Sequence, residues 1–222
     1  MNIALFGGTF DPIHAGHVQA ARAAGREFRL DKVLIIAAGN PPHKYGEQLT
    51  SFPHRYSMVT LACAGEERLI PSLLEAPEGK PCYSIDTVRK VRRSLSGRDH
   101  LYFLIGVDAF LELPSWKQYR PLLDSVDFIV VSRPGFDAQA IRKVVPEAMV
   151  RPAAGGGKPD TLRLRRSSLH LLRGVHMPAA SHAIRRAIRS GQSVTGLLPP
   201  LVEEYILKEG LYRPRRRGNE PG

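Results

Sequence analysis

The sequence predicts an α/β fold with a doubly wound parallel sheet and helices on both of its faces. Short apolar runs typical of buried strands alternate with segments of helical periodicity, and strands joined by helices pair in parallel. A glycine-containing turn follows the first run, where sheets of this kind bind ligands. The 222 residues, 43% of them hydrophobic, are sufficient for one domain over residues 1–212, followed by a basic disordered tail over 213–222.

Each element is predicted from a local pattern. Strands are expected at residues 3–6, 33–38, 101–106 and 128–132, with a weaker one at 169–172. Helices are expected at residues 18–28, 54–65 and 84–95. The last of these repeats apolar residues at the spacing of an amphipathic helix. The glycine-rich run at 153–160 predicts a flexible loop.

Charge and composition narrow the class of protein. The excess of 32 basic over 21 acidic residues gives a net charge of +11, which suggests an anionic partner. Much of this excess lies in the tail and near residues 153–160, and no alternation of aromatic and basic residues is present, so nucleic acid is not an expected partner. No apolar stretch approaches the roughly 20 residues that span a bilayer. Together with the two cysteines, which have no metal-type spacing, this predicts a cytoplasmic protein that does not interact with a membrane.

The stretch GGTFDPIHAGH, residues 7–17, joins the first strand to the first helix and is called the signature segment below. Its glycines permit a sharp turn, and the helix start that follows favours an anion. It lacks both the Lys-Ser/Thr ending of a P-loop and the spaced glycines of a dinucleotide-binding loop. His14 and His17 share one face of the first helical turn. An isolated pair would be a helix cap beside a surface histidine, but the glycines and Thr9 favour stabilisation of charge during phosphoryl or nucleotidyl transfer.

The signature segment resembles the loop of the His-x-Gly-His nucleotidyltransferase superfamily, and it is most similar to the bacterial nicotinate-nucleotide adenylyltransferases. Further segments resemble that family in the expected order: NPPHK (40–44), YSIDTV (83–88), GVDAFLELPSWKQY (106–119), VVSRPG (130–135) and VEEYILKEGLYR (202–213). The resemblance spans nearly the whole chain except the tail. It implies a Rossmann-like fold of the nucleotidyltransferase type.

The resemblance also implies a reaction. AMP would move from ATP, the co-substrate, to nicotinate mononucleotide, giving nicotinate adenine dinucleotide and pyrophosphate in NAD biosynthesis. Because the attacking phosphate is already an anion, no general base is required. Mg²⁺ is expected, held mainly through the ATP phosphates and water, and the sequence assigns it no protein ligand. The alternatives are a sister enzyme acting on nicotinamide mononucleotide or another phosphorylated acceptor, and a non-catalytic nucleic-acid-binding relative; a homo-oligomer is compatible with either.

By resemblance, three groups of residues form the site. The catalytic residues are His14, His17 and Lys44. Those at ATP are Gly7, Gly8, Thr9, Phe10, His14, His17, Asp108, Ser181 and Arg185. Those at the acceptor are Asp11, Lys44, Ser84, Thr87, Trp116 and Arg133.

Several of these residues also have a purely structural interpretation. Ser84 and Thr87 begin a predicted helix and Asp108 begins another, so all three suit helix caps. Trp116 would ordinarily be a core residue, whereas the resemblance makes it a platform for the pyridine ring. Arg133 is equally suited to a salt bridge that fixes the loop after its strand.

The segment AASHAIR, residues 179–185, departs from the family pattern. Ile184 and Arg185 match and Ser181 keeps a hydroxyl, but Ala180 and His182 stand where the family usually has a serine and a threonine. We therefore expect the helix N-terminus and Arg185 to carry most of the phosphate binding here.

Overall fold

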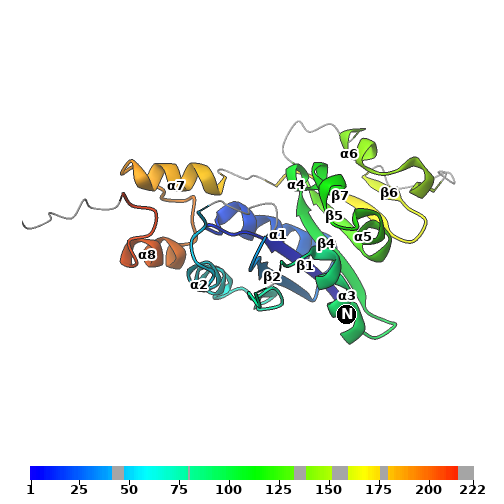
Figure 1. Ribbon diagram of the computed structural model, residues 1–222, viewed down its shortest axis with the longest axis horizontal. Helices are drawn as coiled ribbons and strands as arrows, with labels where there is room; N and C mark the ends of the chain where they lie inside the picture. The colour runs from blue at the N-terminus through cyan, green and yellow to red at the C-terminus, as the bar shows by residue number, and fades with distance from the viewer. Residues whose placement is uncertain (42–47, 80, 133–138, 152–159, 176–179, 215–222) are drawn as a thin grey trace, which may run out of the picture.

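The structure is a computed structural model that describes residues 1–41, 48–79, 81–132, 139–151, 160–175 and 180–214 (Figure 1). Its strands form a seven-stranded sheet in the order β3-β2-β1-β4-β5-β7-β6. The strands are β1 (Asn2–Gly8), β2 (Lys32–Ala37), β3 (Leu69–Ser72), β4 (His100–Gly106), β5 (Asp127–Val131), β6 (Thr161–Arg163) and β7 (Ser168–Leu172). The predicted doubly wound α/β fold is confirmed.

All five expected strands are present, and two further strands were not predicted. Neighbouring strands pair in parallel except β6 and β7, which are antiparallel. The unpredicted strands lie at the two edges of the sheet. β3 contains Pro71, which lacks an N–H group and is tolerated only at such an edge, and β6 is three residues long. Neither therefore has the long apolar run by which the central strands are recognised.

The three predicted helices are confirmed with shifted ends, and shorter ones join them. The α-helices are α1 (Ala15–Glu27), α2 (Phe52–Cys63), α3 (Ser84–Ser94), α4 (Val107–Leu111), α5 (Tyr119–Ser125), α6 (Gln139–Val144), α7 (Ser181–Arg189) and α8 (Pro200–Lys208). Two short 3₁₀ turns are η2 (Leu113–Ser115) and η3 (Glu147–Met149). α1 begins three residues before the predicted start, because His14 has extended backbone geometry and the helix follows directly from it.

A hydrophobic core lies on each face of the sheet. In β1, Ala4 and Phe6 belong to one core, while Ile3 and Leu5 belong to the other. α1, α2, α7 and α8 contribute to the first core, and α3, α4, α5 and α6 contribute to the second. The sheet is thus covered on both faces, as its continuous apolar strands require.

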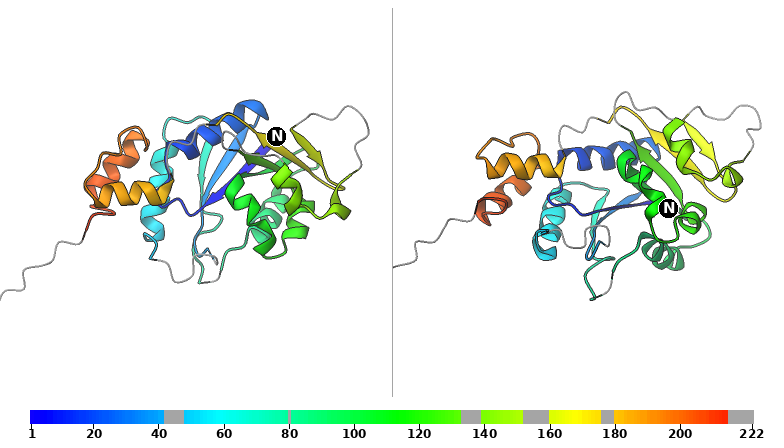
Figure 2. Two further views of the ribbon diagram at one scale, coloured as in Figure 1. Left: turned by 90° about the horizontal axis from the view of Figure 1, so that it is seen from above. Right: turned by 45° about the horizontal axis from the view of Figure 1, so that its top comes forward.

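The order of the strands creates a crevice above β1 and β4. The chain leaves β1 toward β2 on one side and leaves β4 toward β5 on the other, and ligands of doubly wound sheets bind at such a switch point. The C-terminal helices α7 and α8 lie at one end of the molecule, and α8 packs beside α2 (Figures 1 and 2). Within the part of the chain that the structure describes, no helix is long and apolar enough to cross a membrane.

Candidate active site

A cavity of about 1070 Å³ lies at the carboxyl ends of β1 and β4. It is bounded on one side by the signature segment and on the other by the residues that begin α3 and follow η2. The predicted site residues that line it are Gly7, Gly8, Thr9, Phe10, His14, His17, Ser84, Asp108, Trp116 and Ser181. Predicted site residues from five segments of the sequence therefore share one cavity, which is large enough for a nucleotide and a second ligand.

The turn in the signature segment depends on a close contact between Gly8 and Phe10. Phe10 has a φ of 48°, in the left-handed region, and its ring folds back over Gly8. A Cβ atom on Gly8 would lie 2.9 Å from that ring, so only glycine fits without a shift. The Phe10 ring also meets the His17 ring edge-on, with centroids 5.0 Å apart. Phe10 thus packs against His17 in the wall of the cavity.

His14 and His17 form a stacked pair. The backbone N–H of His14 donates a hydrogen bond to Nδ1 of His17 over 3.2 Å, so a neutral His17 carries its proton on Nε2. Burial lowers the pKa of His14 to about 4. Burial, and then the charge of His14, hold the pKa of His17 well below its usual value. Both rings are therefore neutral near pH 7.

Nδ1 of His14 is buried and has no hydrogen-bond partner among the described residues. An unpaired polar atom in a protein interior is costly, and such groups are rare in native structures. His14 also lines the cavity, so this atom belongs to the wall of the candidate site.

Arg55 of α2 braces the loops around this cavity from inside the protein. Its side chain is only 2% exposed. Its guanidinium donates hydrogen bonds to the carbonyl oxygens of Thr50 (2.9 Å), Thr9 (2.8 Å), Ala38 (2.8 Å) and Gly39 (3.4 Å). Burial lowers its pKa, and the charge of Asp11 opposes that shift. One side chain therefore ties the signature segment to the loop that follows β2.

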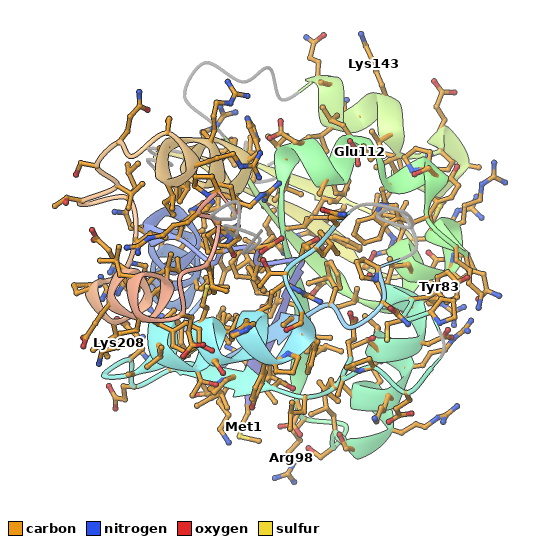
Figure 3. All side chains as sticks on the ribbon, turned by 60° about the vertical axis from the view of Figure 1, so that its left-hand side comes forward. Met1, Tyr83, Arg98, Glu112, Lys143 and Lys208 are labelled. Atoms are coloured by element: carbon orange, nitrogen blue, oxygen red, sulfur yellow. The ribbon has the colours of Figure 1, made fainter. Side chains whose placement is uncertain are left out.

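The opposite wall of the cavity is built at the start of α3 and around Trp116. Tyr83 precedes α3 (Figure 3), and Lys117 Nζ lies 3.9 Å from the centre of the Tyr83 ring. Trp116 meets Phe103 edge-on, with centroids 6.3 Å apart. Thr87 is buried, and its hydroxyl donates a 2.7 Å hydrogen bond to Glu75, whose pKa is raised by burial.

Three predicted site residues do not line this cavity in the described part of the chain. Asp11 is 3% exposed, and its carboxylate accepts hydrogen bonds from the Thr50 N–H and the Tyr212 hydroxyl. Thr87 is bound to Glu75, as described above, and Arg185 donates to the Asp11 carbonyl oxygen. Contact of these residues with substrate stays a prediction. Lys44, Arg133 and most of the predicted loop at 153–160 lie outside the described residues.

The sequence analysis did not identify Arg55, Glu75 and Tyr212 as part of the site. Arg55 could have been identified from the sequence HRYSMVTLA, because it lies on the same helix face as the apolar residues that are buried. Glu75 and Tyr212 acquire their partners only through tertiary structure, and no local pattern marks them. Among the described residues no group of three His, Cys, Asp or Glu side chains could hold a metal ion.

Comparison with known proteins agrees with the fold. Residues 5–187 match the Cytidylyltransferase-like family. The chain is 40% identical over 212 residues to the "Probable nicotinate-nucleotide adenylyltransferase" of Solibacter usitatus, covering 96% of this chain and 100% of the relative. Its identity to the protein of the same name from Desulfotalea psychrophila is 36% over 213 residues, covering 95% and 99%.

A solved structure supports the fold. The structure of Plasmodium falciparum nicotinic acid mononucleotide adenylyltransferase complexed with NaAD is similar, with a TM-score of 0.73, 20% identity, and coverage of 95% of this chain and 97% of that one. The full-length matches at 36% and 40% identity extend the likeness from the fold to the family. The chain belongs to the nicotinate-nucleotide adenylyltransferase family.

Proposed function

We propose that this chain transfers AMP from ATP to nicotinate mononucleotide, giving nicotinate adenine dinucleotide and pyrophosphate. The observation that carries the proposal is the shared cavity: the His14–His17 pair and an aromatic wall with a helix N-terminus face one space. The first suits a polyphosphate and the second suits a pyridine ring that bears a carboxylate. The relatives of known name, at up to 40% identity over the full chain, support the same reaction.

Catalysis in this cavity is alignment and neutralisation of charge. The acceptor phosphate is already a nucleophile, so the protein needs only to hold two anions in line and stabilise the charge that develops at the α-phosphorus. The Nε2–H of His17 is a fixed donor for that charge, because the His14 N–H holds the other ring nitrogen. His14 supplies the second ring, and Lys44 is proposed to supply a cation from the loop after β2.

The other proposed ATP contacts come from the turn and from two helix starts. Gly7, Gly8, Thr9 and Phe10 let the backbone approach the nucleotide closely. Asp108 is proposed to accept from the ribose hydroxyls. The first N–H groups of α7, together with Ser181 and Arg185, suit the terminal phosphates, since a helix start favours an anion.

The acceptor side explains a preference for nicotinate. The first N–H groups of α3 have no partner within the helix, and the carboxylate of nicotinate accepts hydrogen bonds there, beside Ser84. The amide of nicotinamide gains less from the same dipole. Trp116 offers a flat face to the pyridine ring. Thr87, through its hydrogen bond to Glu75, holds the first turn of α3 in place, and Arg133 is proposed as a further cation at this side.

We propose that Mg²⁺ arrives with ATP, on phosphate oxygens and water, and supplies charge neutralisation at the phosphates. The cavity wall fits this arrangement, because Asp108 and Glu75 are its carboxylates in the described part of the chain and Glu75 is bonded to Thr87. We further propose that the protein works in the cytoplasm. A homo-oligomer stays a prediction that sedimentation would test.

The decisive experiment measures pyrophosphate release from ATP with a panel of phosphorylated acceptors. We expect nicotinate mononucleotide to give the highest kcat/KM and nicotinamide mononucleotide to be strongly disfavoured. Equal values for the two would contradict the assignment of the α3 wall and favour the sister activity. Steeply salt-dependent oligonucleotide binding with no turnover of ATP would favour the nucleic-acid-binding alternative.

A further inference from the structure

The C-terminal segment, residues 180–212, is hydrogen-bonded to the signature segment at its turn. Four hydrogen bonds join the two, although they lie more than 160 residues apart in the sequence. They run from Tyr212 Oη to Asp11 Oδ1 (2.6 Å), from Arg185 Nη1 to Asp11 O (2.6 Å), from Ser181 Oγ to Pro12 O (2.9 Å) and from the Ala15 N–H to Leu197 O (2.9 Å). The turn that presents His14 and His17 is therefore held by the last part of the fold.

The bond between Tyr212 and Asp11 differs from the other three because it uses a side chain of the signature segment. The second oxygen of this carboxylate accepts the Thr50 N–H over 3.2 Å. Both oxygens therefore have protein partners. The charge of this buried group also acts on the guanidinium of Arg55. A carboxylate that faced the phosphates would repel them, whereas here its partners keep it within the protein.

The backbone geometry and the packing of Tyr212 favour its hydrogen bond to Asp11. Its φ is 65°, a left-handed conformation that non-glycine residues rarely adopt, and its ring packs against the core formed by α1, α2, α7 and α8. Burial and the adjacent Asp11 raise the pKa of the Tyr212 hydroxyl, which keeps it a proton donor. Tyr212 thus combines a left-handed backbone with a half-buried hydroxyl donor, and the donor meets one oxygen of the Asp11 carboxylate.

We propose that Tyr212 and Asp11 form a clasp that positions the His14–His17 turn for ATP, so that both act as positioning residues. The inference rests on the proposed function, because it assigns ATP to that turn. The acceptor wall is carried by α3 and Trp116, which belong to other elements. Loosening the clasp therefore affects use of ATP and leaves binding of the acceptor unchanged.

The test compares Tyr212→Phe with Tyr205→Phe. Tyr205 belongs to the same C-terminal segment, and its hydroxyl makes a 2.8 Å hydrogen bond to the His54 ring of α2. Each variant removes one hydroxyl and keeps the ring. We expect Tyr212→Phe to lower kcat/KM for ATP about tenfold, the effect of losing a hydrogen bond to a charged group. We expect KM for the acceptor to stay within about twofold, and Tyr205→Phe to match the wild type in both.

Two further measurements keep the inference decidable. Asp11→Asn should cost little in the Tyr212→Phe background if the two residues act as a unit. The ¹⁵N chemical shifts of the His14 and His17 rings should change in Tyr212→Phe and stay unchanged in Tyr205→Phe. These chemical shifts do not depend on turnover, so they test the role of the clasp even if the wild type adenylates no acceptor. Unchanged ring shifts with wild-type kcat/KM for ATP in Tyr212→Phe would overturn the proposal.

Discussion

The rings of His14 and His17 stack, with centroids 3.6 Å apart and planes inclined by 26°. Two imidazolium ions at this distance would repel each other, so the pair works with neutral rings in the unliganded protein. The His14 N–H fixes the tautomer of His17, since it occupies Nδ1. The turn therefore holds His17 in the tautomer whose proton is on Nε2.

His17→Ala should lower turnover by about 10²–10³, the usual cost of losing one positioned donor in a site of this kind. The fold should survive, which thermal unfolding would check. His17→Asn is the matched variant, because its amide oxygen can still accept the His14 N–H and its NH₂ group can still donate. We expect Asn to retain more activity than Ala; near-normal turnover in the Ala variant would return His17 to a structural role.

The histidine pair also predicts a dependence of stability on pH. The pKa of His14 falls from 6.5 unfolded to about 4 in the native state, so between these values the unfolded chain binds more protons. The contribution of neutral His14 to the free energy of unfolding should be fully present above pH 6.5. It should be lost as the pH drops toward 4, which lowers the free energy of unfolding by up to about 3 kcal/mol.

Urea unfolding at pH 7.5 and pH 5 measures this difference. Glu75 has the opposite pH dependence. Burial raises the pKa of its carboxyl, so its contribution to the free energy of unfolding is lost as the pH rises. The comparison is therefore made between the wild type and His14→Asn, which removes the His14 contribution and its effect on His17 and leaves Glu75 in place. Identical pH slopes for the two proteins would contradict the prediction.

The central part of the fold could be predicted from the sequence because it is local. β1, β2, β4 and β5 are buried on both faces, so each is a continuous apolar run. β3 and β6 lie at edges, where such a run is not required, and they were missed for that reason. The start of α1 was placed too late because His14 and His17 interrupt the apolar periodicity.

The site also contains some residues that a local pattern marks and others that are brought in only by tertiary structure. The signature segment is continuous in the sequence, so the position of its glycines and histidines in one cavity could be predicted from residue types and spacing. Arg55 and Tyr212 act through partners far along the chain: Arg55 meets Thr9 from 46 residues away and Tyr212 meets Asp11 from 201. Asp11 is an example. The sequence analysis assigned it to the acceptor, whereas the hydrogen bonds of its carboxylate to Thr50 and Tyr212 are visible only in the folded chain.

Arg55→Met should destabilise the protein by about 3 kcal/mol or more, because it leaves several buried carbonyl groups without a donor. Methionine keeps much of the side-chain volume, so the effect reports the lost hydrogen bonds. Arg22→Ala is the control, since Arg22 is 51% exposed and pairs with Glu66 at the surface. A surface pair contributes at most about 1 kcal/mol. Similar losses in the two variants, measured by urea unfolding, would argue against the bracing role.

Gly39→Ala should perturb the acceptor side of the site. A Cβ atom at Gly39 would lie 2.1 Å from the carbonyl oxygen of Glu75 and 2.9 Å from the nitrogen of Pro77, and both are backbone atoms. The segment that carries Glu75 must therefore move, and with it the partner of Thr87. We expect a loss of about 1–3 kcal/mol in stability and a raised KM for the acceptor. Gly97→Ala is the control, because nothing lies within 4 Å of its Cβ position; equal behaviour of the two variants would contradict the close approach.

The last prediction concerns AASHAIR, where the chain departs from the family pattern. Arg185 uses one N–H group on the Asp11 carbonyl oxygen, and the fork geometry of a guanidinium leaves other donors for a phosphate. If the start of α7 supplies the remaining contacts through its backbone, the missing serine and threonine hydroxyls are not required. Arg185→Ala should then raise KM for ATP much more than KM for the acceptor.

Two comparisons on the same helix make that result specific. Arg186 is exposed, so Arg186→Ala should leave both KM values close to those of the wild type. His182→Thr restores the hydroxyl usual in the family and should improve use of ATP only modestly, because we expect the backbone and Arg185 to hold the phosphates. A large gain in His182→Thr would mean that the side-chain hydroxyl matters more than the dipole. Titration of ATP with Mg²⁺ into the wild type sets the limit for all of these variants: no detectable binding up to millimolar nucleotide would show that this chain has lost the ATP site, and with it the adenylyl transfer that the family membership implies.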